Sequence, residues 1–508
     1  MSDGAQIGGG GPRPAGPGAF VRRLGLLDAT MIVVGSMVGS GIFIVSADIA
    51  RQVNSPGLLL VVWLVTGVMT VVCALCYGEL AAAMPDAGGQ YVYLRESLGP
   101  MWGFLYGWTM LLVIQTATIA AVAIAFAKFT GVVLPWFSST SWLWRIGTFG
   151  PYPTWFGDLG PYTVGLNTQN LLAILSIVVL TAWNLRGIHA GALVQNIFTI
   201  TKTAALLGVI LLGFLFATPE AIHANFGAFW GPTTEATWIG VVTMIGVAMV
   251  GSLFAADAWN NVTFVAGEVK DPARNLPRSL ALGAGLVMLL YVLANLSYLS
   301  VLPLAGSPKA SGVIERGIQY AAEDRVATAV AEVVLGSAGG VIMAIAVMIS
   351  TFGCNNGLIL AGARIYYAMA RDRLFFSGVG VLNSRLAPAP ALLVQGVWAS
   401  LLCLSGTYSQ LLDFLIFAVL LFYLLTIGGI FVLRRRRPDM ARPYRVWGYP
   451  LLPLLYMALA LFIEIQLLRY KPQYTWPGLI IVLLGVPVYW AWRKATNVPL
   501  SPGGRGLG

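Results

Sequence analysis

Charged residues are scarce in this sequence of 508 residues. They make up only 10% of the chain, whereas hydrophobic residues make up 58%, and the mean hydropathy is +0.80. This composition leaves too little polar surface to cover a soluble globular protein. The sequence therefore predicts an integral membrane protein.

Histidine and cysteine are rare as well. The two histidines, His189 and His223, do not stand at a spacing typical of a metal site or of a nucleophile with its base. All four cysteines fall inside apolar runs and are expected to pack there as small side chains: Cys73, Cys76, Cys354 and Cys403. The sequence thus predicts no enzyme, no catalytic residue, no metal site and no cofactor.

Long apolar runs, by contrast, fill the chain. A run of about 20 residues is long enough to cross a membrane as a helix. Twelve such runs are predicted, near residues 26–49, 57–83, 101–127, 169–185, 192–217, 238–265, 279–303, 333–363, 389–404, 411–433, 449–468 and 476–492. The expected fold class is therefore an all-α integral membrane protein with twelve transmembrane helices.

The basic residues indicate the orientation of these helices. Most of the 30 lysines and arginines fall in segments that share one side of the membrane with the N-terminus. By the positive-inside rule both termini are predicted to be cytoplasmic, in a plasma (inner) membrane. Residues 1–22, rich in glycine and proline, are expected to be a disordered cytoplasmic tail, and residues 494–508 a second cytoplasmic tail. The arginine run at 434–437 is either a topology anchor or a surface for acidic lipid headgroups.

Two of the apolar runs have polar interruptions. The first run carries Gly35, Gly39, Ser40 and Gly41, and the sixth is interrupted at residues 254–261. Irregular backbone inside a membrane survives only where protein or a water-filled cavity surrounds it. Interrupted spans in corresponding halves of a chain are typical of a transporter's substrate site. Their spacing predicts a five-helix unit at 23–217, an inverted copy at 238–433 and two further helices within 448–493.

The first interruption frees backbone N–H groups around Ser40 and Gly41, at the positive end of the half-helix that follows. A carboxylate is expected to bind there. The alternative is that Gly35 and Gly39 form a packing face of small residues.

The sixth run complements the first. Its freed carbonyl groups carry partial negative charge that suits an ammonium group, so the two interruptions together describe an amino acid. Phe254 is predicted to close over the ligand, and Asn260 to hold the unwound segment or to bind substrate. Three roles stay open for Asp257: a proton carrier, an amine contact, or an acceptor for freed N–H groups.

Lys202 lies about ten residues into the fifth run, which is roughly 15 Å along a helix. A buried ammonium group must be paired or donate to several oxygens. It is predicted to be a fixed cation in the place where sodium-coupled transporters hold Na⁺. A second hypothesis is that Lys202 carries a proton. The alternative is a lysine that reaches the cytoplasmic interface. Glu79, at the end of the second run, is expected to pair with a basic loop.

Five motifs together carry a family resemblance. They are GSMVGSGIF at 35–43, CYGEL at 76–80, PDAGGQY at 85–91, FAADAWNNV at 254–262 and EVKDPARNLP at 268–277. Over residues 22–490 the chain resembles the amino acid, polyamine and organocation permeases. It is most similar to bacterial members of the L-type amino acid transporter group.

The resemblance implies a leucine-transporter-type 5+5 inverted repeat in which helices 1 and 6 are unwound at mid-membrane. It also implies that the substrate carboxylate binds at Ser40, Gly41 and Ile42, and the amine at the carbonyls of Phe254, Ala255 and Asp257. Phe254 is then the gate. The complete predicted substrate site adds three residues to these: Ser36, Gly39 and Asn260.

The expected function is sodium-independent transport of neutral amino acids by alternating access, as an exchanger. A proton-coupled symporter and a transporter-like amino acid sensor are the alternatives. The expected partners are the substrate and membrane lipid, and not nucleic acid. Animal members that form heteromers often have tyrosine and glycine where this chain has Ala256 and Asp257. The segment at 131–168 lacks cysteine, so no disulfide-linked subunit is expected, and its aromatic residues predict an interfacial cap or a lid.

Overall fold

The computed structural model describes residues 22, 24–85, 88–154, 157–159, 161–186, 189–231, 237–385, 387–404 and 408–496. The predicted tails at 1–22 and 494–508 fall largely outside these residues. Within them the chain is mainly helical, as the apolar runs predict.

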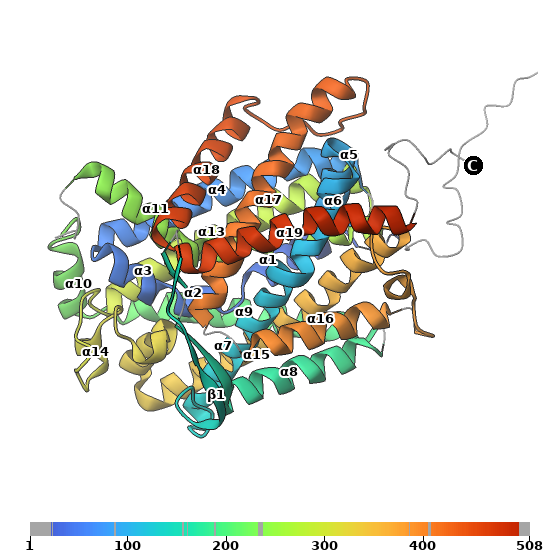
Figure 1. The fold of residues 1–508 in the computed structure, drawn as a ribbon. Coiled ribbons are helices and arrows are strands. Elements are labelled where there is room, and N and C mark those ends of the chain that lie inside the picture. The colour runs from blue at the N-terminus through green and yellow to red at the C-terminus, as the bar shows by residue number, and fades with distance from the viewer. Residues whose placement is uncertain are drawn as a thin grey trace, which may run out of the picture.

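The first half consists of helices and a β-hairpin insertion between α7 and α8 (Figure 1). The helices are α1 Leu26–Met37, α2 Gly41–Ile44, α3 Ser46–Val53, α4 Pro56–Ala83, α5 Gln90–Leu98, α6 Pro100–Thr109, the π-helix η1 Met110–Ile114, α7 Gln115–Val133, α8 Thr168–Asn184, α9 His189–Leu215 and α10 Pro219–Phe226. The strands are β1 Trp142–Phe149, β2 Tyr152–Thr154, β3 Gly157–Leu159 and β4 Tyr162–Asn167.

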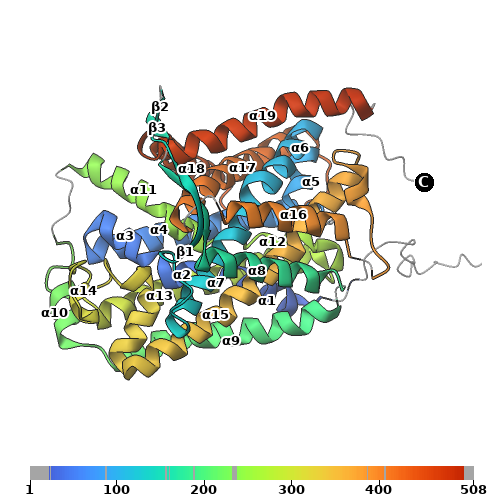
Figure 2. The same cartoon turned by 60° about the horizontal axis from the view of Figure 1, so that its bottom comes forward.

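The second half is built from helices alone among the described residues. They are α11 Trp238–Ala255, α12 Asn261–Phe264, η2 Ala266–Glu268, α13 Pro272–Val301, α14 Val313–Arg316, η3 Ala322–Asp324, α15 Val326–Arg371, η4 Ser377–Gly380, α16 Ala389–Leu402, α17 Tyr408–Arg436, α18 Leu451–Tyr470 and α19 Pro472–Thr496. Elements far apart in sequence pack together, such as α8 beside α16 and α4 beside α13 (Figures 1 and 2).

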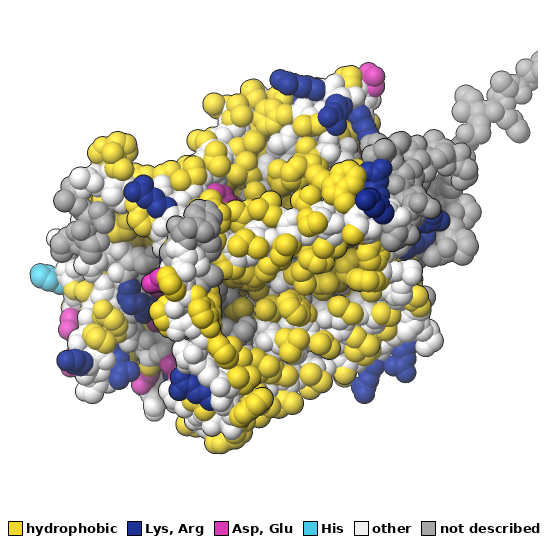
Figure 3. Space-filling model, viewed as in Figure 1, with side chains coloured by type: hydrophobic (Ala, Val, Ile, Leu, Met, Phe, Trp, Pro, Cys, Tyr) yellow, Lys and Arg dark blue, Asp and Glu magenta, His cyan; other side chains and the backbone are white. Residues whose placement is uncertain are grey.

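Ten helical segments in the described part of the chain are long and apolar enough to cross a membrane. Two shorter apolar helices, α8 and α16, coincide with the predicted spans 169–185 and 389–404. The surface has the same character, because hydrophobic side chains cover most of the face in Figure 3 while lysines and arginines lie at its borders. The protein is therefore a helical membrane protein with many spans.

Both predicted interruptions are present as breaks between helices. The first break separates α1 from α2 at residues 38–40, and the second separates α11 from α12 at residues 256–260. In the second break Ala258 has a φ of 66°, a left-handed conformation that costs a residue with a side chain about 1 kcal/mol or more. Surrounding contacts must hold such a backbone in place.

The segment predicted as an interfacial cap or a lid forms a β-hairpin. Strand β1 pairs with β4 in antiparallel register, and β2 pairs with β3 beyond them. The hairpin crosses the outside of the helices toward α18 and α19, where the Tyr162 hydroxyl donates to the Gln473 carbonyl at 2.8 Å (Figure 2). At its base the Gly165 N–H donates to the Leu404 carbonyl at 3.2 Å. The hairpin therefore straps the ends of several helices together.

Glu79 forms a clamp that joins the end of α4 to the last turn of α17 and to the segment that follows α17. Its side chain is 3% exposed and accepts two hydrogen bonds from the Arg434 guanidinium, at 2.9 and 2.7 Å. The backbone N–H of Val446 donates to the same carboxylate at 2.8 Å. The predicted pairing of Glu79 with a basic segment is thus confirmed.

Replacing Glu79 with glutamine should weaken this clamp. The substitution removes the charge that the two arginine N–H groups and the Val446 N–H contact, so we expect a loss of about 3 kcal/mol of stability. Thermal unfolding of the purified protein in detergent measures the change. The control is Arg437→Gln, since Arg437 is 42% exposed and pairs with Glu96 at 3.1 Å, a surface contact worth at most about 1 kcal/mol. Equal unfolding temperatures for the two variants would contradict the clamp.

Candidate substrate site

The carbonyl end of α1 is satisfied by side chains from other helices. The last carbonyls of a helix have no partner within it, and here each of four in succession accepts a hydrogen bond. The donors are Lys202 to Gly35, the Cys354 thiol to Ser36 at 3.6 Å, the Tyr291 hydroxyl to Met37 at 2.8 Å and the Ser350 hydroxyl to Val38 at 3.4 Å. Three helices, α9, α13 and α15, therefore converge on the first break.

Lys202 places a positive charge at this point. Its side chain is fully buried in α9, and its ammonium group donates to the Gly35 carbonyl. No carboxylate among the described residues forms an ion pair with it. The negative end of the α1 helix dipole and the freed carbonyls offset the charge instead. Because the side chain is buried, the alternative of a lysine that reaches the interface is wrong.

The N–H groups on the other side of the first break are free. The backbone N–H groups of residues 39–42 donate to no described residue, whereas those of Phe43 and Val45 donate to the carbonyls of Ser40 and Gly41. Ile42 itself is fully buried, and its carbonyl accepts from the Tyr298 hydroxyl at 3.3 Å. The first break thus presents unpaired donors next to a fixed cation, a setting that favours an anionic group.

The two breaks touch each other. A Cβ atom on Gly41 would lie 2.5 Å from the Cβ of Ala255, so only glycine allows this approach. The Ser40 and Tyr408 hydroxyls share a hydrogen bond of 3.1 Å, and the Tyr408 ring packs edge-on against Phe254 with centroids 5.9 Å apart. Tyr408, the first residue of α17, therefore links both breaks.

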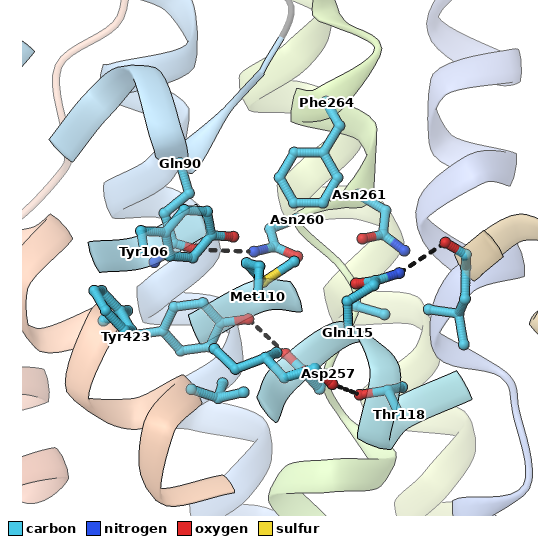
Figure 4. Close-up of a pocket in the computed structure, with 15 residues that line it drawn as sticks. Gln90, Tyr106, Met110, Gln115, Thr118, Asp257, Asn260, Asn261, Phe264 and Tyr423 are labelled. Atoms are coloured by element: carbon cyan, nitrogen blue, oxygen red, sulfur yellow. Dashed lines mark hydrogen bonds between the residues drawn. The ribbon is translucent and has the colours of Figure 1, made fainter. Parts of the chain in front are cut away.

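Asp257 and Asn260 lie elsewhere, on the wall of a separate cavity (Figure 4). The Tyr423 hydroxyl donates to Asp257 at 2.5 Å, and the Asn260 amide donates to Gln90 at 3.3 Å. The cavity offers about 20 Å³ to the centre of a water molecule, which is room for about one water. Its walls come from α5, α6, η1, α7, α12, α15 and α17 as well as the second break.

The predicted site residues therefore form two groups in this conformation. One group surrounds the contact between the breaks: Ser36, Gly39, Ser40, Gly41, Ile42, Phe254 and Ala255. The other consists of Asp257 and Asn260 at the cavity. The breaks are in contact in this conformation, and the cavity beside the second group has room for about one water.

The second break offers fewer free carbonyls than expected. The Phe254 carbonyl already accepts from the N–H of Asp257 at 3.1 Å. The Ala255 carbonyl accepts from no described residue, so it remains open to an ammonium group. The aspartate carboxylate has the Tyr423 hydroxyl as a side-chain partner, which the sequence did not predict.

Several residues that line the cavity were not predicted from the sequence. Gln90, Gln115 and Tyr423 line the cavity together with Asp257, and Gln115 also donates to the Leu358 carbonyl at 2.7 Å. A signal was present, since Gln115 is a polar residue inside the apolar run 101–127 and Tyr423 lies inside 411–433. Only the packing of the helices shows that they meet.

Replacing Tyr408 with phenylalanine tests the link between the breaks. The ring and its contact with Phe254 remain, but the hydrogen bond with Ser40 is lost, so we expect about a fivefold slower transport rate at nearly unchanged thermal stability. Initial rates in proteoliposomes measure this. Tyr162→Phe, which removes a comparable hydrogen bond from the hairpin, should leave the rate unchanged. Equal rates for Tyr408→Phe and Tyr162→Phe would show that the Tyr408 hydroxyl has no role at this site.

Comparison with known proteins identifies the family. A family model described as amino acid permease matches residues 24–488. The chain belongs to the amino acid permease family. It is therefore a transporter and not an enzyme.

Individual relatives are similar along nearly the whole permease. The mouse large neutral amino acids transporter small subunit 2 is 33% identical over 96% of this chain and 82% of its own. The mouse b(0,+)-type amino acid transporter 1 is 28% identical over 94% of this chain and 91% of its own. The mouse Asc-type amino acid transporter 1 is 30% identical, with coverage of 94% and 82%.

Proposed function

We propose that this permease is a sodium-independent exchanger of neutral amino acids that works by alternating access. The observation that carries the proposal is the position of Lys202. Its ammonium group is fixed at the carbonyl end of α1, beside the free N–H groups of the first break. A resident cation there supplies the positive charge that a bound sodium ion would otherwise supply.

The substrate would bind when the two breaks move apart. Its carboxylate would accept from the N–H groups of residues 39–42, and its ammonium group would bind the carbonyls of the second break, including that of Ala255. Phe254 would act as the gate, because its ring already packs on Tyr408 directly beside Ser40. Ser36, Asp257 and Asn260 complete the proposed site.

The proposed architecture follows the sequence analysis. We infer twelve spans arranged as the five-helix unit 23–217, its inverted copy 238–433 and two helices within 448–493. The breaks in α1–α2 and α11–α12, one in each unit, support the inverted repeat. Both termini would be cytoplasmic and the membrane would be the plasma membrane.

One mouse relative is named a small subunit, which raises the question of whether this chain also has a partner subunit. All four cysteines of this chain are buried in the helices. A disulfide to another protein requires an accessible thiol. We therefore propose that any partner of this chain binds without a disulfide.

The proposal is tested with the purified protein in sodium-free proteoliposomes. Labelled alanine should enter vesicles that are loaded with unlabelled alanine and should scarcely enter empty ones. Added sodium should change neither result. Uptake that requires sodium, or no uptake of any amino acid, would overturn the proposal.

Proton-coupled symport is the second candidate, and Asp257 is the observation that favours it. Its carboxylate shares a short hydrogen bond with Tyr423 and lies between two small cavities, both of which these two residues line. A carboxylate in such a place is suited to carry a proton. Uptake into empty vesicles that rises with an inward proton gradient, and is lost in Asp257→Asn, would favour symport over exchange.

A further inference from the structure

The four arginines at the end of α17, residues 434–437, make different contacts. Arg434 is bound to Glu79, and Arg437 forms an ion pair with Glu96 at 3.1 Å. Arg435 and Arg436 lie between them, are exposed and pair with no carboxylate among the described residues. Two arginines of the run are therefore paired with carboxylates, and the other two pair with none among the described residues.

Arg445 brings a third free charge to the same place. It is exposed and forms no ion pair with a described residue. Its neighbour Val446 and Arg434, the neighbour of Arg435, contact the same carboxylate of Glu79. The path from the backbone at 435 through the Arg434 side chain and the Glu79 carboxylate to the backbone at 445 is at most roughly 20 Å long, counting about 3.8 Å for adjacent Cα atoms. Long arginine side chains from both can reach one ligand.

The remaining charged residues of this segment do not neutralise the three arginines. Asp439 is the acidic residue of residues 434–451, and it is exposed without an ion pair to a described residue. Arg442 is held by backbone carbonyls, including those of Leu433 at 3.0 Å and Arg437 at 2.8 Å. The surface thus keeps a net positive charge.

Exposed apolar side chains border the three arginines. Trp447 is 76% exposed and Leu451, at the start of α18, is 72% exposed. The apolar surface continues along α18 through Leu454 and Leu461. Figure 3 shows lysine and arginine side chains beside hydrophobic ones along this edge of the molecule. Tryptophan and arginine next to an apolar belt are typical of the boundary between lipid tails and headgroups.

We propose that Arg435, Arg436 and Arg445 bind the phosphate of an anionic phospholipid, whose tails lie on α18. Arginine suits a phosphate because its N–H groups donate in a fixed fork. A soluble phosphate would gain nothing from the neighbouring Trp447 and Leu451, which is why a lipid is the expected source. This lipid site is distinct from the proposed transport site, which lies at the helix breaks.

Binding at this surface would also regulate transport. The lipid site is continuous with the clamp on Glu79, and Gly78 next to it packs against Tyr444 and against Pro277 of α13. A lipid that fixes the position of the 435–445 segment therefore also fixes the position of α4 relative to α13. This regulatory part rests on the proposed transport function, whereas lipid binding does not.

The test compares the full-length wild type with two triple variants of equal charge change. Arg435→Gln, Arg436→Gln and Arg445→Gln remove the site, while Arg186→Gln, Arg274→Gln and Arg385→Gln remove three exposed arginines elsewhere. Native mass spectrometry counts phosphatidylglycerol bound per protein during a lipid titration. Each basic residue contributes roughly fivefold, so the site variant should bind about a hundredfold more weakly, and the control variant should bind like the wild type.

Two results would overturn the proposal. One is unchanged phosphatidylglycerol binding by the site variant, and the other is displacement of the lipid by an equimolar amount of inorganic phosphate. Exchange rates in vesicles with and without phosphatidylglycerol then test regulation: the wild type should be faster with it, and the site variant should not respond. A wild type that binds the lipid but transports no amino acid would refute the proposed transport and leave the lipid site standing.

Discussion

Replacing Lys202 with alanine should reduce sodium-free exchange by about a hundredfold or more, because charge and hydrogen bonding are lost together from the site. The change leaves the Gly35 carbonyl without its donor and removes the cation beside the free N–H groups of the first break. Initial exchange rates in proteoliposomes, normalised to the reconstituted protein, measure the loss.

The control for this variant is Lys309→Ala, which removes an exposed lysine distant in sequence from Lys202. This variant should exchange like the wild type. If Lys202 replaces sodium, the Lys202→Ala protein should also regain some activity when sodium is added. Wild-type exchange by Lys202→Ala without sodium would contradict the fixed-cation role.

Replacing Gly41 with valine should abolish transport. Even the first side-chain atom would lie 2.5 Å from Ala255, well inside van der Waals contact, so the two breaks could not close on each other. We expect roughly a hundredfold lower rate, since overpacking by a valine costs about 3 kcal/mol at the upper end of its usual range and falls on the moving contact. Transport assays and size-exclusion profiles together separate this from misfolding.

A smaller change gives a sharper comparison. Gly41→Ala should be impaired, and the added Ala255→Gly should restore part of the rate because it removes the nearer of two clashing atoms, the Ala255 Cβ at 2.5 Å, although the Cα at 2.7 Å remains. Gly208→Ala, which places its new methyl group in open space on α9, serves as the control and should be fully active. Rates for Gly41→Ala equal to those of Gly208→Ala would show that the breaks do not need this contact.

The sequence predicts the helical breaks and the cation because each violates a local rule. Glycines and polar residues inside an apolar run, or a lysine ten residues into one, are expensive in a membrane unless they have partners. The observed breaks at 38–40 and 256–260, and the buried ammonium group of Lys202, follow from that cost.

Other parts of the site depend on how distant helices pack, and no local pattern encodes that. Tyr408 forms a hydrogen bond with Ser40, which is 368 positions away in the sequence. Tyr423 forms one with Asp257, which is 166 positions away. A tyrosine at the edge of an apolar run also suits the membrane interface, so its type alone does not reveal a site. The aromatic segment 131–168 predicts a cap or a lid, but its composition does not reveal the backbone pairing that makes it a hairpin.

The proposed transport requires the two breaks to separate and to bind one amino acid between them. An experimental density map of the protein with bound alanine, in sodium-free buffer, would show whether they do. We expect the alanine carboxylate within hydrogen-bonding distance of the N–H groups of residues 39–42, and its ammonium group at the carbonyls of the second break. Alanine bound elsewhere, with Gly41 still in contact with Ala255, would refute this mode of binding.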